Sequence, residues 1–84
     1  MLDVEKAFGA VLRRMRKERG WTQENLAARA DIERTFVSFL ERGLRQPTLT
    51  SILKIAEALG VSAADIVGQV EAEMSKAGRG GTHR

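Results

Sequence analysis

The sequence predicts an all-α fold in which five helices form one compact domain. Three observations lead to this prediction. Apolar residues recur at intervals of three and four along most of the chain, which is the period of helices that bury one side. Alternating apolar and polar residues are almost absent, and the chain has one proline and no tyrosine, so little favours strands. Hydroxyl residues and glycines stand at the ends of the periodic segments, where helices begin and end.

The first helix is expected from about Asp3 to Arg19, with Gly20 as the left-handed residue that ends it. Its apolar stripe consists of Val4, Ala7, Phe8, Val11, Leu12 and Met15. Residues 13 to 19 carry five basic side chains against one acid, whereas residues 48 to 77 are slightly acidic. Basic charge therefore gathers in the first half of the chain, which favours a polyanionic partner, although a solvated helix face also explains it.

The second and third helices are expected within residues 22 to 42. Thr22 can cap the second helix, and Trp21 and Leu26 flank the cap as a hydrophobic staple, which makes the tryptophan a core residue. The turn after the second helix consists of Asp31 and Ile32 alone. Two short helices joined so tightly cannot lie antiparallel, so we expect them to cross steeply.

The fourth helix is expected to begin at the cap Thr48 and to end at Gly60. Its apolar residues are Leu49, Ile52, Leu53, Ile55, Ala56 and Leu59. Ser62 and Asp65 form a capping-box pattern for a fifth helix, with apolar residues along one side at Ile66, Val67, Val70 and Met74. Residues 78 to 84 are small, charged and aperiodic. We therefore expect one domain over residues 1–77 and a disordered tail over 78–84.

Composition excludes several classes of function. The 84 residues include no cysteine and a single histidine, His83, so we expect no disulfide scaffold, metal site or catalytic centre, and no cofactor or small-molecule ligand is indicated. No apolar run approaches the roughly 20 residues of a membrane span. The N-terminal segment lacks the apolar centre of a signal peptide. A cytoplasmic protein that is not an enzyme is the expected class.

Three spaced motifs carry a resemblance to a known family. A helix, a tight turn and a second helix let the second helix enter the major groove of DNA. The stretches TQENLA, I-x-RT-F-V-S and LERG-x-R-x-PTL resemble the Cro/repressor-like (XRE) helix-turn-helix family, and the match covers residues 5–67. Within that family the closest likeness is to controller proteins of restriction–modification systems. The resemblance implies a lambda-repressor-like fold. The family often has glycine where this chain has Asp31, so we expect a positive φ there.

The third helix would be the recognition helix. Arg34 and Thr35 lie at its N-terminal end, where side chains reach base edges, and Ser38 follows one turn later. An arginine can donate two hydrogen bonds to a guanine, and a threonine can contact a base or a phosphate. Phe39 is placed with this base-reading group, and Phe36 with the contacts to the DNA backbone. For both phenylalanines, packing against neighbouring helices is the alternative.

Sequence-independent contacts are expected around these residues. Gln23 matches the family glutamine that contacts a phosphate or a flanking base. Arg16 and Glu41 match a family pair that orients the arginine near the DNA backbone. Arg42 and Arg45 flank the loop after the recognition helix, and we expect both to contact phosphates.

The last third of the sequence suggests a homodimer. Its apolar residues exceed what the fourth and fifth helices alone can bury, and the family resemblance also implies dimers through this region. The predicted interface residues are Leu59, Val61, Ile66, Val67 and Val70. A two-fold dimer would place its recognition helices about 34 Å apart and read an inverted repeat. Alternatively, the fifth helix packs over its own domain.

The sequence therefore predicts a sequence-specific transcriptional regulator whose partners are double-stranded DNA and a second copy of itself. RNA polymerase is a further candidate partner. Control by its own concentration, including at its own promoter, fits a small regulator of the controller type. The alternative is an interaction module of the antitoxin or coactivator kind, in which the fold persists but a protein partner dominates.

Overall fold

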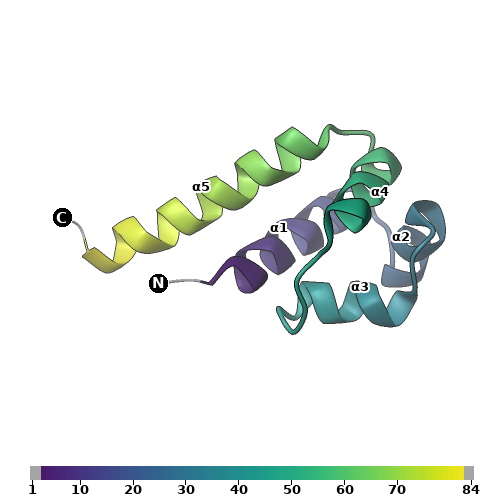
Figure 1. Ribbon diagram of the computed structural model, residues 1–84, viewed down its shortest axis with the longest axis horizontal. Coiled ribbons are helices and arrows are strands. Elements are labelled where there is room, and N and C mark those ends of the chain that lie inside the picture. The colour runs from purple at the N-terminus through teal and green to yellow at the C-terminus, as the bar shows by residue number, and fades with distance from the viewer. Residues whose placement is uncertain (1–2, 83–84) are drawn as a thin grey trace.

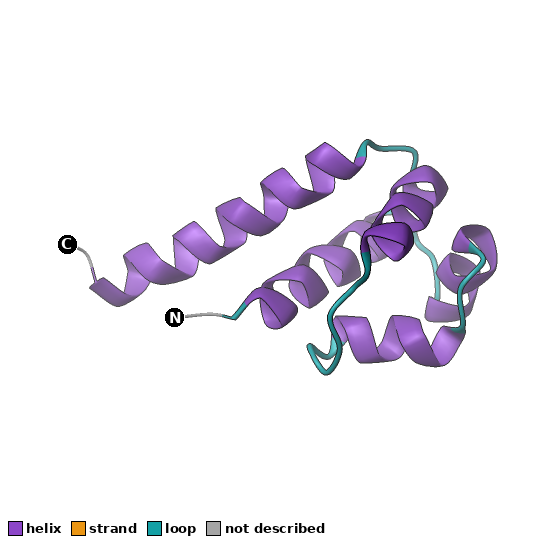
Figure 2. Ribbon diagram, viewed as in Figure 1, coloured by secondary structure: helices purple, strands orange, loops and turns teal. Residues whose placement is uncertain are grey.

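The computed structural model confirms the all-α fold. The structure describes the backbone of residues 3–82 and the side chains of residues 3–76. Within this part of the chain there are helices and loops but no strand (Figure 2). The five helices are α1 (Val4–Glu18), α2 (Gln23–Ala30), α3 (Arg34–Glu41), α4 (Leu49–Leu59) and α5 (Ala63–Thr82).

Local signals in the sequence fix the helix ends. The hydroxyl of Thr22 accepts from the amide of Asn25 at 3.0 Å, and the Asn25 side chain accepts from the amide of Thr22 at 3.0 Å, which completes a capping box. Thr48 caps α4 in the same manner by accepting from the Ser51 amide at 3.0 Å. Asp31, which ends α2, has φ 58° and ψ 49°. The left-handed turn predicted for this non-glycine residue is therefore present.

Helix α1 lies at the centre of the molecule. It contacts α3 and α5, while α2 contacts α3 and α4, and α4 also contacts α5. In Figure 1, α3 and α5 lie on opposite sides of α1. Every helix contributes to the core that this arrangement encloses, and its largest fully buried side chains are Leu12, Leu26, Leu40, Ile55, Ile66, Val11 and Val37.

The crossing of α1 over the end of α3 depends on a buried glycine. A Cβ added to Gly9 would lie 2.5 Å from the carbonyl oxygen of Leu40 and 2.6 Å from that of Glu41. These separations are shorter than carbon and oxygen can tolerate, so only glycine permits the observed approach. This contact helps to fix the position of α3 against α1, and no sequence pattern had indicated it.

Helix α5 extends further than the sequence predicts. Its backbone is helical to Thr82, which includes part of the segment 78–84 that was expected to form a tail. No proline follows residue 47, and a glycine keeps the amide that the helical hydrogen-bond series requires. The last two residues, 83 and 84, lie outside the described part of the chain.

Arginines on α1 connect it to neighbouring helices. The Arg19 guanidinium donates to the carbonyl of Leu59, with Nη2 at 2.8 Å and Nε at 3.2 Å, and so covers the C-terminal end of α4. Arg14 donates to Gln69 of α5 at 2.8 Å. Part of the basic run predicted as a solvated face is therefore structural.

No helix in the described residues is both long enough and apolar enough to cross a membrane.

Candidate nucleic-acid interface

Helix α3 presents a polar face on the side opposite its buried side. Val37 and Leu40 are fully buried. Because successive helical residues are rotated by about 100°, the opposite side carries Thr35, Ser38 and Phe39, with Arg42 just after the helix. Thr35 is exposed, and Ser38 and Phe39 are half-buried. The predicted base-reading residues therefore lie on one accessible face.

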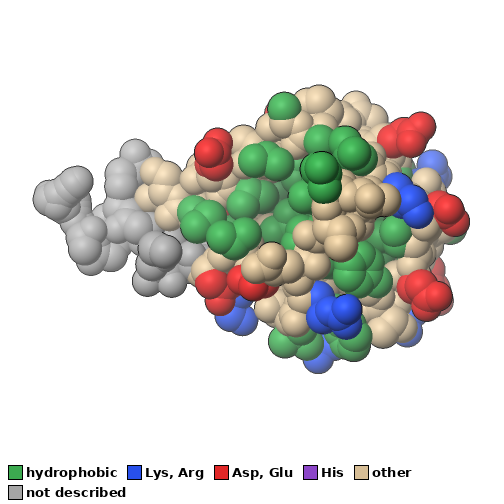
Figure 3. Space-filling view, in the orientation of Figure 1, with side chains coloured by type: hydrophobic (Ala, Val, Ile, Leu, Met, Phe, Trp, Pro, Cys, Tyr) green, Lys and Arg blue, Asp and Glu red, His purple; other side chains and the backbone are tan. Residues whose placement is uncertain are grey.

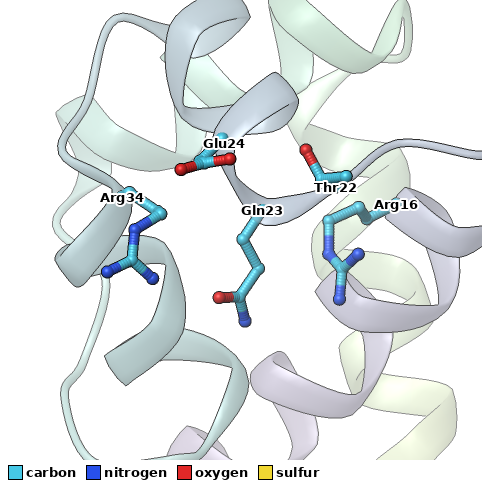
Figure 4. Close-up of a pocket in the computed structure, with 5 residues that line it drawn as sticks. All are labelled: Arg16, Thr22, Gln23, Glu24 and Arg34. Atoms are coloured by element: carbon cyan, nitrogen blue, oxygen red, sulfur yellow. The ribbon is translucent and has the colours of Figure 1, made fainter.

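Arg34 begins α3 beside the N-terminal end of α2. Its exposed side chain lines a shallow pocket with Arg16, Thr22, Gln23 and Glu24. In Figure 4, Arg34 and Gln23 extend to the same side of the helix pair. The structure thus brings a predicted base-reading residue next to the predicted phosphate ligand. Glu24, which the sequence analysis did not single out, adds a carboxylate to this pocket.

A hydrogen-bond network joins α1, α2 and α3 at this pocket. Arg16 donates to both oxygens of Glu41, at 2.6 Å from Nε and 2.9 Å from Nη2, and its Nη1 donates to the carbonyl of Trp21 at 2.8 Å. Gln23 donates through Nε2 to Glu41 Oε1 at 3.1 Å. The hydrogen bonds and charge of Glu41 raise the pKa of Arg16 above its ordinary value, against the opposing effect of burial.

This network gives Arg16 a structural role. The side chain is buried, and all three guanidinium nitrogens are bonded to protein acceptors. Arg16 therefore orients Glu41 and the start of α2, and its contact with the DNA backbone stays a prediction. Gln23 is half-buried. Its amide nitrogen is held by Glu41, so the carboxylate also sets the direction of the glutamine.

The two phenylalanines of α3 occupy different environments. Phe36 is partly buried and packs against the hydrophobic core, as the packing alternative expects, and its contact with the DNA backbone stays a prediction. Phe39 is not among the residues that pack against that core. The Arg42 guanidinium carbon lies 5.9 Å from the centre of the Phe39 ring. Arg42 and Arg45 are both exposed after the C-terminal end of α3.

Most of the predicted dimer residues are buried inside the protomer. Leu59, Ile66 and Val70 belong to the core, and Val61 packs partly against it. The protomer's own core takes up these side chains because α1 also covers α5, a contact that the comparison of α4 with α5 alone did not include. Their part in a dimer stays a prediction. Val67 is 46% exposed and stays a candidate.

Other apolar residues are exposed on α4. Leu49 is 71% exposed and Leu53 is 53% exposed. Figure 3 shows hydrophobic side chains gathered over α4 and beside α5 on one face of the molecule. The sequence offered a signal for this face, because Leu53 directly follows Ile52 and so widens the apolar arc of α4 beyond what one neighbour can cover. We call Leu49, Leu53 and Val67 the apolar face.

The described residues contain no group of three histidine, cysteine, aspartate or glutamate side chains that could hold a metal ion. His83 lies outside the described part of the chain. The accessible groups on α3 and at the pocket are hydrogen-bonding side chains, cationic side chains, the Glu24 carboxylate and the Phe39 ring. These groups suit recognition of an anionic partner whose surface presents hydrogen-bonding groups in a specific arrangement.

Comparisons with known proteins agree with this geometry. The helix-turn-helix family model matches residues 12–66. An HTH-type transcriptional regulator of Sinorhizobium fredii, y4dJ, is 41% identical over 66 residues, which cover 79% of this chain and 86% of that protein. The control protein C.MunI of a Mycoplasma species is 35% identical over 74 residues, which cover 87% of this chain and 100% of C.MunI.

A solved structure extends this comparison to DNA. The restriction–modification controller protein C.Esp1396I was solved as a tetramer in complex with its natural 35 base-pair operator. It superposes on this chain with a TM-score of 0.77 at 30% identity, covering 87% of this chain and 96% of that one.

Proposed function

The chain belongs to the helix-turn-helix family of DNA-binding transcription regulators, and we propose that it binds an operator with α3 in the major groove. The observation that carries this proposal is the accessible face of α3. It presents Arg34, Thr35 and Ser38, and Arg34 lies beside the N-terminal end of α2. A bidentate arginine specifies guanine, and hydroxyl groups can bond to bases or phosphates.

Exposed cations at both ends of α3 support this orientation. Arg34 precedes the reading face, and Arg42 and Arg45 follow it. Eight helical residues span about 12 Å, which matches the width of the major groove. Arg34 contacts a guanine at the N-terminal end of α3, whereas Arg42 and Arg45 contact phosphates beyond its C-terminal end. Gln23 contacts a phosphate near the N-terminal end of α2, a position that favours anions.

The regulator acts as a homodimer that reads an inverted repeat. The apolar face (Leu49, Leu53 and Val67) supports this proposal, because burying it against a second copy removes exposed apolar area from water. The operator complex of C.Esp1396I supports oligomeric binding by a similar chain. Dimer formation depends on concentration, so occupancy of the operator, including one at its own promoter, follows the amount of protein.

Selection of bound duplexes from a random DNA pool tests the proposal. Wild type is expected to enrich an inverted repeat with guanine in each half-site. Arg34→Ala removes the bidentate contact, which is worth about 1–3 kcal/mol of discrimination, so the guanine preference is lost. Arg45→Ala is the control, because losing a phosphate contact weakens all sequences alike and reduces the slope of log K against log salt by about one.

Two outcomes would reject this function. Folded wild-type protein that enriches no sequence is not an operator reader, and a dominant protein partner would then be the function to pursue. Equal preferences for wild type and Arg34→Ala would mean that α3 does not read through its first residue. Circular dichroism of each variant establishes that it is folded before either result is interpreted.

A further inference from the structure

We infer that Phe39 recognises the C5-methyl group of a pyrimidine, so that α3 reads thymine or C5-methylated cytosine in each half-site. This inference rests on the proposed function, because it requires α3 to enter the major groove. It assigns a ligand group to an aromatic side chain whose position the fold does not otherwise explain.

The other aromatic residues all have packing roles. The chain has three phenylalanines and one tryptophan. Phe8 is a buried core residue, and Phe36 and Trp21 pack against the core from its edge. Phe39 alone among them does not pack against this cluster, although it lies in α3 one residue before the fully buried Leu40.

The position of Phe39 on α3 directs it toward the groove. Val37 and Leu40 define the buried side. At about 100° per residue, Phe39 is rotated by about 200° from Val37 and Thr35 by about 160°. Both side chains therefore lie on the side of the helix opposite Val37, about 40° apart. The ring therefore projects with the base-reading residues. The side chain is half-buried.

Two neighbours restrict the ring. Arg42 follows three residues later, and its guanidinium carbon lies 5.9 Å from the ring centre, within the range of a cation–π contact. Thr35 precedes it by four residues, a spacing at which helical side chains meet. A threonine methyl and a phenyl ring together make a small apolar surface within an otherwise polar face.

The major groove offers one apolar group that fits this surface. Thymine presents its C5-methyl there, whereas unmodified cytosine, adenine and guanine present only polar edges or hydrogen. A methyl group on C5 of cytosine occupies the equivalent position and is chemically the same. The polar atoms of the base are read by other residues, so Phe39 should respond to the methyl group itself.

The size of the effect follows from one methyl group. Burying a methyl-sized apolar group contributes about 0.8 kcal/mol, which corresponds to about fourfold in affinity. Two symmetric half-sites would give about 15-fold if both methyl groups were removed together. An effect of this size is measurable by direct titration.

The test uses the duplex that wild type selects from a random pool. Each thymine is replaced in turn by deoxyuridine, which removes only the methyl group, and binding is titrated at fixed salt. One symmetric position is expected to weaken binding about fourfold per half-site. Phe39→Ala should bind the thymine and deoxyuridine duplexes equally, whereas Phe39→Leu should retain part of the difference. In a second arm, 5-methylcytosine at that position should bind more tightly than cytosine by the same factor.

Arg34→Ala serves as the control, because it weakens binding but should leave the effect of the methyl group intact. The inference is overturned if no deoxyuridine position affects wild type, which would leave Phe39 in contact with a sugar. It is also overturned if the methyl effect persists in Phe39→Ala. Failure of the proposed function itself is recognised earlier, because no duplex would then be selected.

Discussion

At the scale of single residues, Glu41 serves three helices at once. Its side chain is only 1% exposed, and it accepts hydrogen bonds from Arg16 of α1 and Gln23 of α2. Breaking a buried ion pair costs more than the pair contributes, because the remaining charge stays buried without a partner. The carboxylate therefore links the stability of the domain to the direction of a proposed phosphate ligand.

We expect Glu41→Ala to lower the free energy of unfolding by about 3–5 kcal/mol, a large part of the stability of a small domain. Glu41→Gln should cost less, because the amide keeps one acceptor for Arg16. Urea denaturation provides the measurement, and the exposed Glu24→Gln is the control, with a change within about 0.5 kcal/mol. Equal midpoints for Glu41→Gln and Glu24→Gln would contradict the role of the network.

The pH dependence of this pair follows from Arg16. Its pKa is raised in the folded state, so its charge stabilises the fold at every pH below the ordinary arginine range. That contribution is lost only as the pH rises through the raised pKa. The stability difference between wild type and Glu41→Gln should therefore stay constant between pH 7 and about pH 10. A difference that shrinks over this interval would show that another group controls it.

Asp31 ends α2 with a left-handed backbone that glycine adopts more readily. Asp31→Gly should raise the free energy of unfolding by about 0.5–1 kcal/mol, and Asp31→Ala should lower it by about 1 kcal/mol. Thermal and urea unfolding measure both changes. Lys54 approaches the Asp31 carboxylate at 3.9 Å, but both groups are on the surface, where such pairs contribute little. If Asp31→Gly is less stable than wild type, the Lys54–Asp31 ion pair contributes more to stability than the release of backbone strain at residue 31.

At the scale of helices, the glycines of α1 and α5 offer a matched comparison. Gly9→Ala would place a Cβ against the carbonyl oxygens of Leu40 and Glu41, so α1 and α3 would have to separate. We expect a loss of about 2 kcal/mol or more, typical of overpacking in a core. Gly68→Ala has no atom within 4 Å of the new Cβ and should gain up to about 1 kcal/mol from helix propensity.

Calorimetry of the two variants measures these opposite shifts in melting temperature. DNA binding separates the positions further, because a displaced α3 should weaken operator binding in Gly9→Ala even at temperatures where the variant is folded. Equal melting temperatures for the two alanine variants would mean that the approach of α1 to α3 is more adaptable than the structure indicates.

The sequence determined these helices through local signals. The caps Thr22 and Thr48 act on amides three residues away, so both could be predicted from local residues. The positive φ of Asp31 was expected from the family resemblance. Exposure of Arg34 and Thr35 follows from the helical period relative to Val37. The sequence therefore defined much of the candidate site.

Contacts between distant segments could not be predicted in this way. Gly9 meets α3 across more than 30 residues of chain, and α1 covers α5 from the other end of the sequence. The second contact helps to bury Ile66 and Val70 within the protomer. The different surroundings of Phe36 and Phe39 likewise depend on which helices surround α3, and periodicity leaves that open.

At the scale of the whole molecule, α1 separates α3 from α5, which carries Val67 of the apolar face (Figure 1). A second copy that covers Val67 therefore approaches from across α1 and leaves α3 open to DNA. Dimer formation would raise operator affinity, because binding of one half-site makes binding of the other intramolecular.

We expect Val67→Glu and Leu53→Glu each to convert the dimer to a monomer at micromolar concentration, because a buried carboxylate without a partner opposes association. Sedimentation velocity measures this change. Ala72→Glu, which adds the same charge to an exposed position of α5 beside Lys76, should remain dimeric.

DNA binding then distinguishes loss of the dimer from damage to the reading surface. A monomer variant should bind an isolated half-site as wild type does, since α3 is unchanged. Its affinity for the complete inverted repeat should fall at least tenfold, because the two half-sites are no longer linked. If Val67→Glu and Leu53→Glu both remain dimers with full affinity for the repeat, the copies associate through another surface. Weaker binding to the half-site would instead indicate that the substituted helices hold α3 in place.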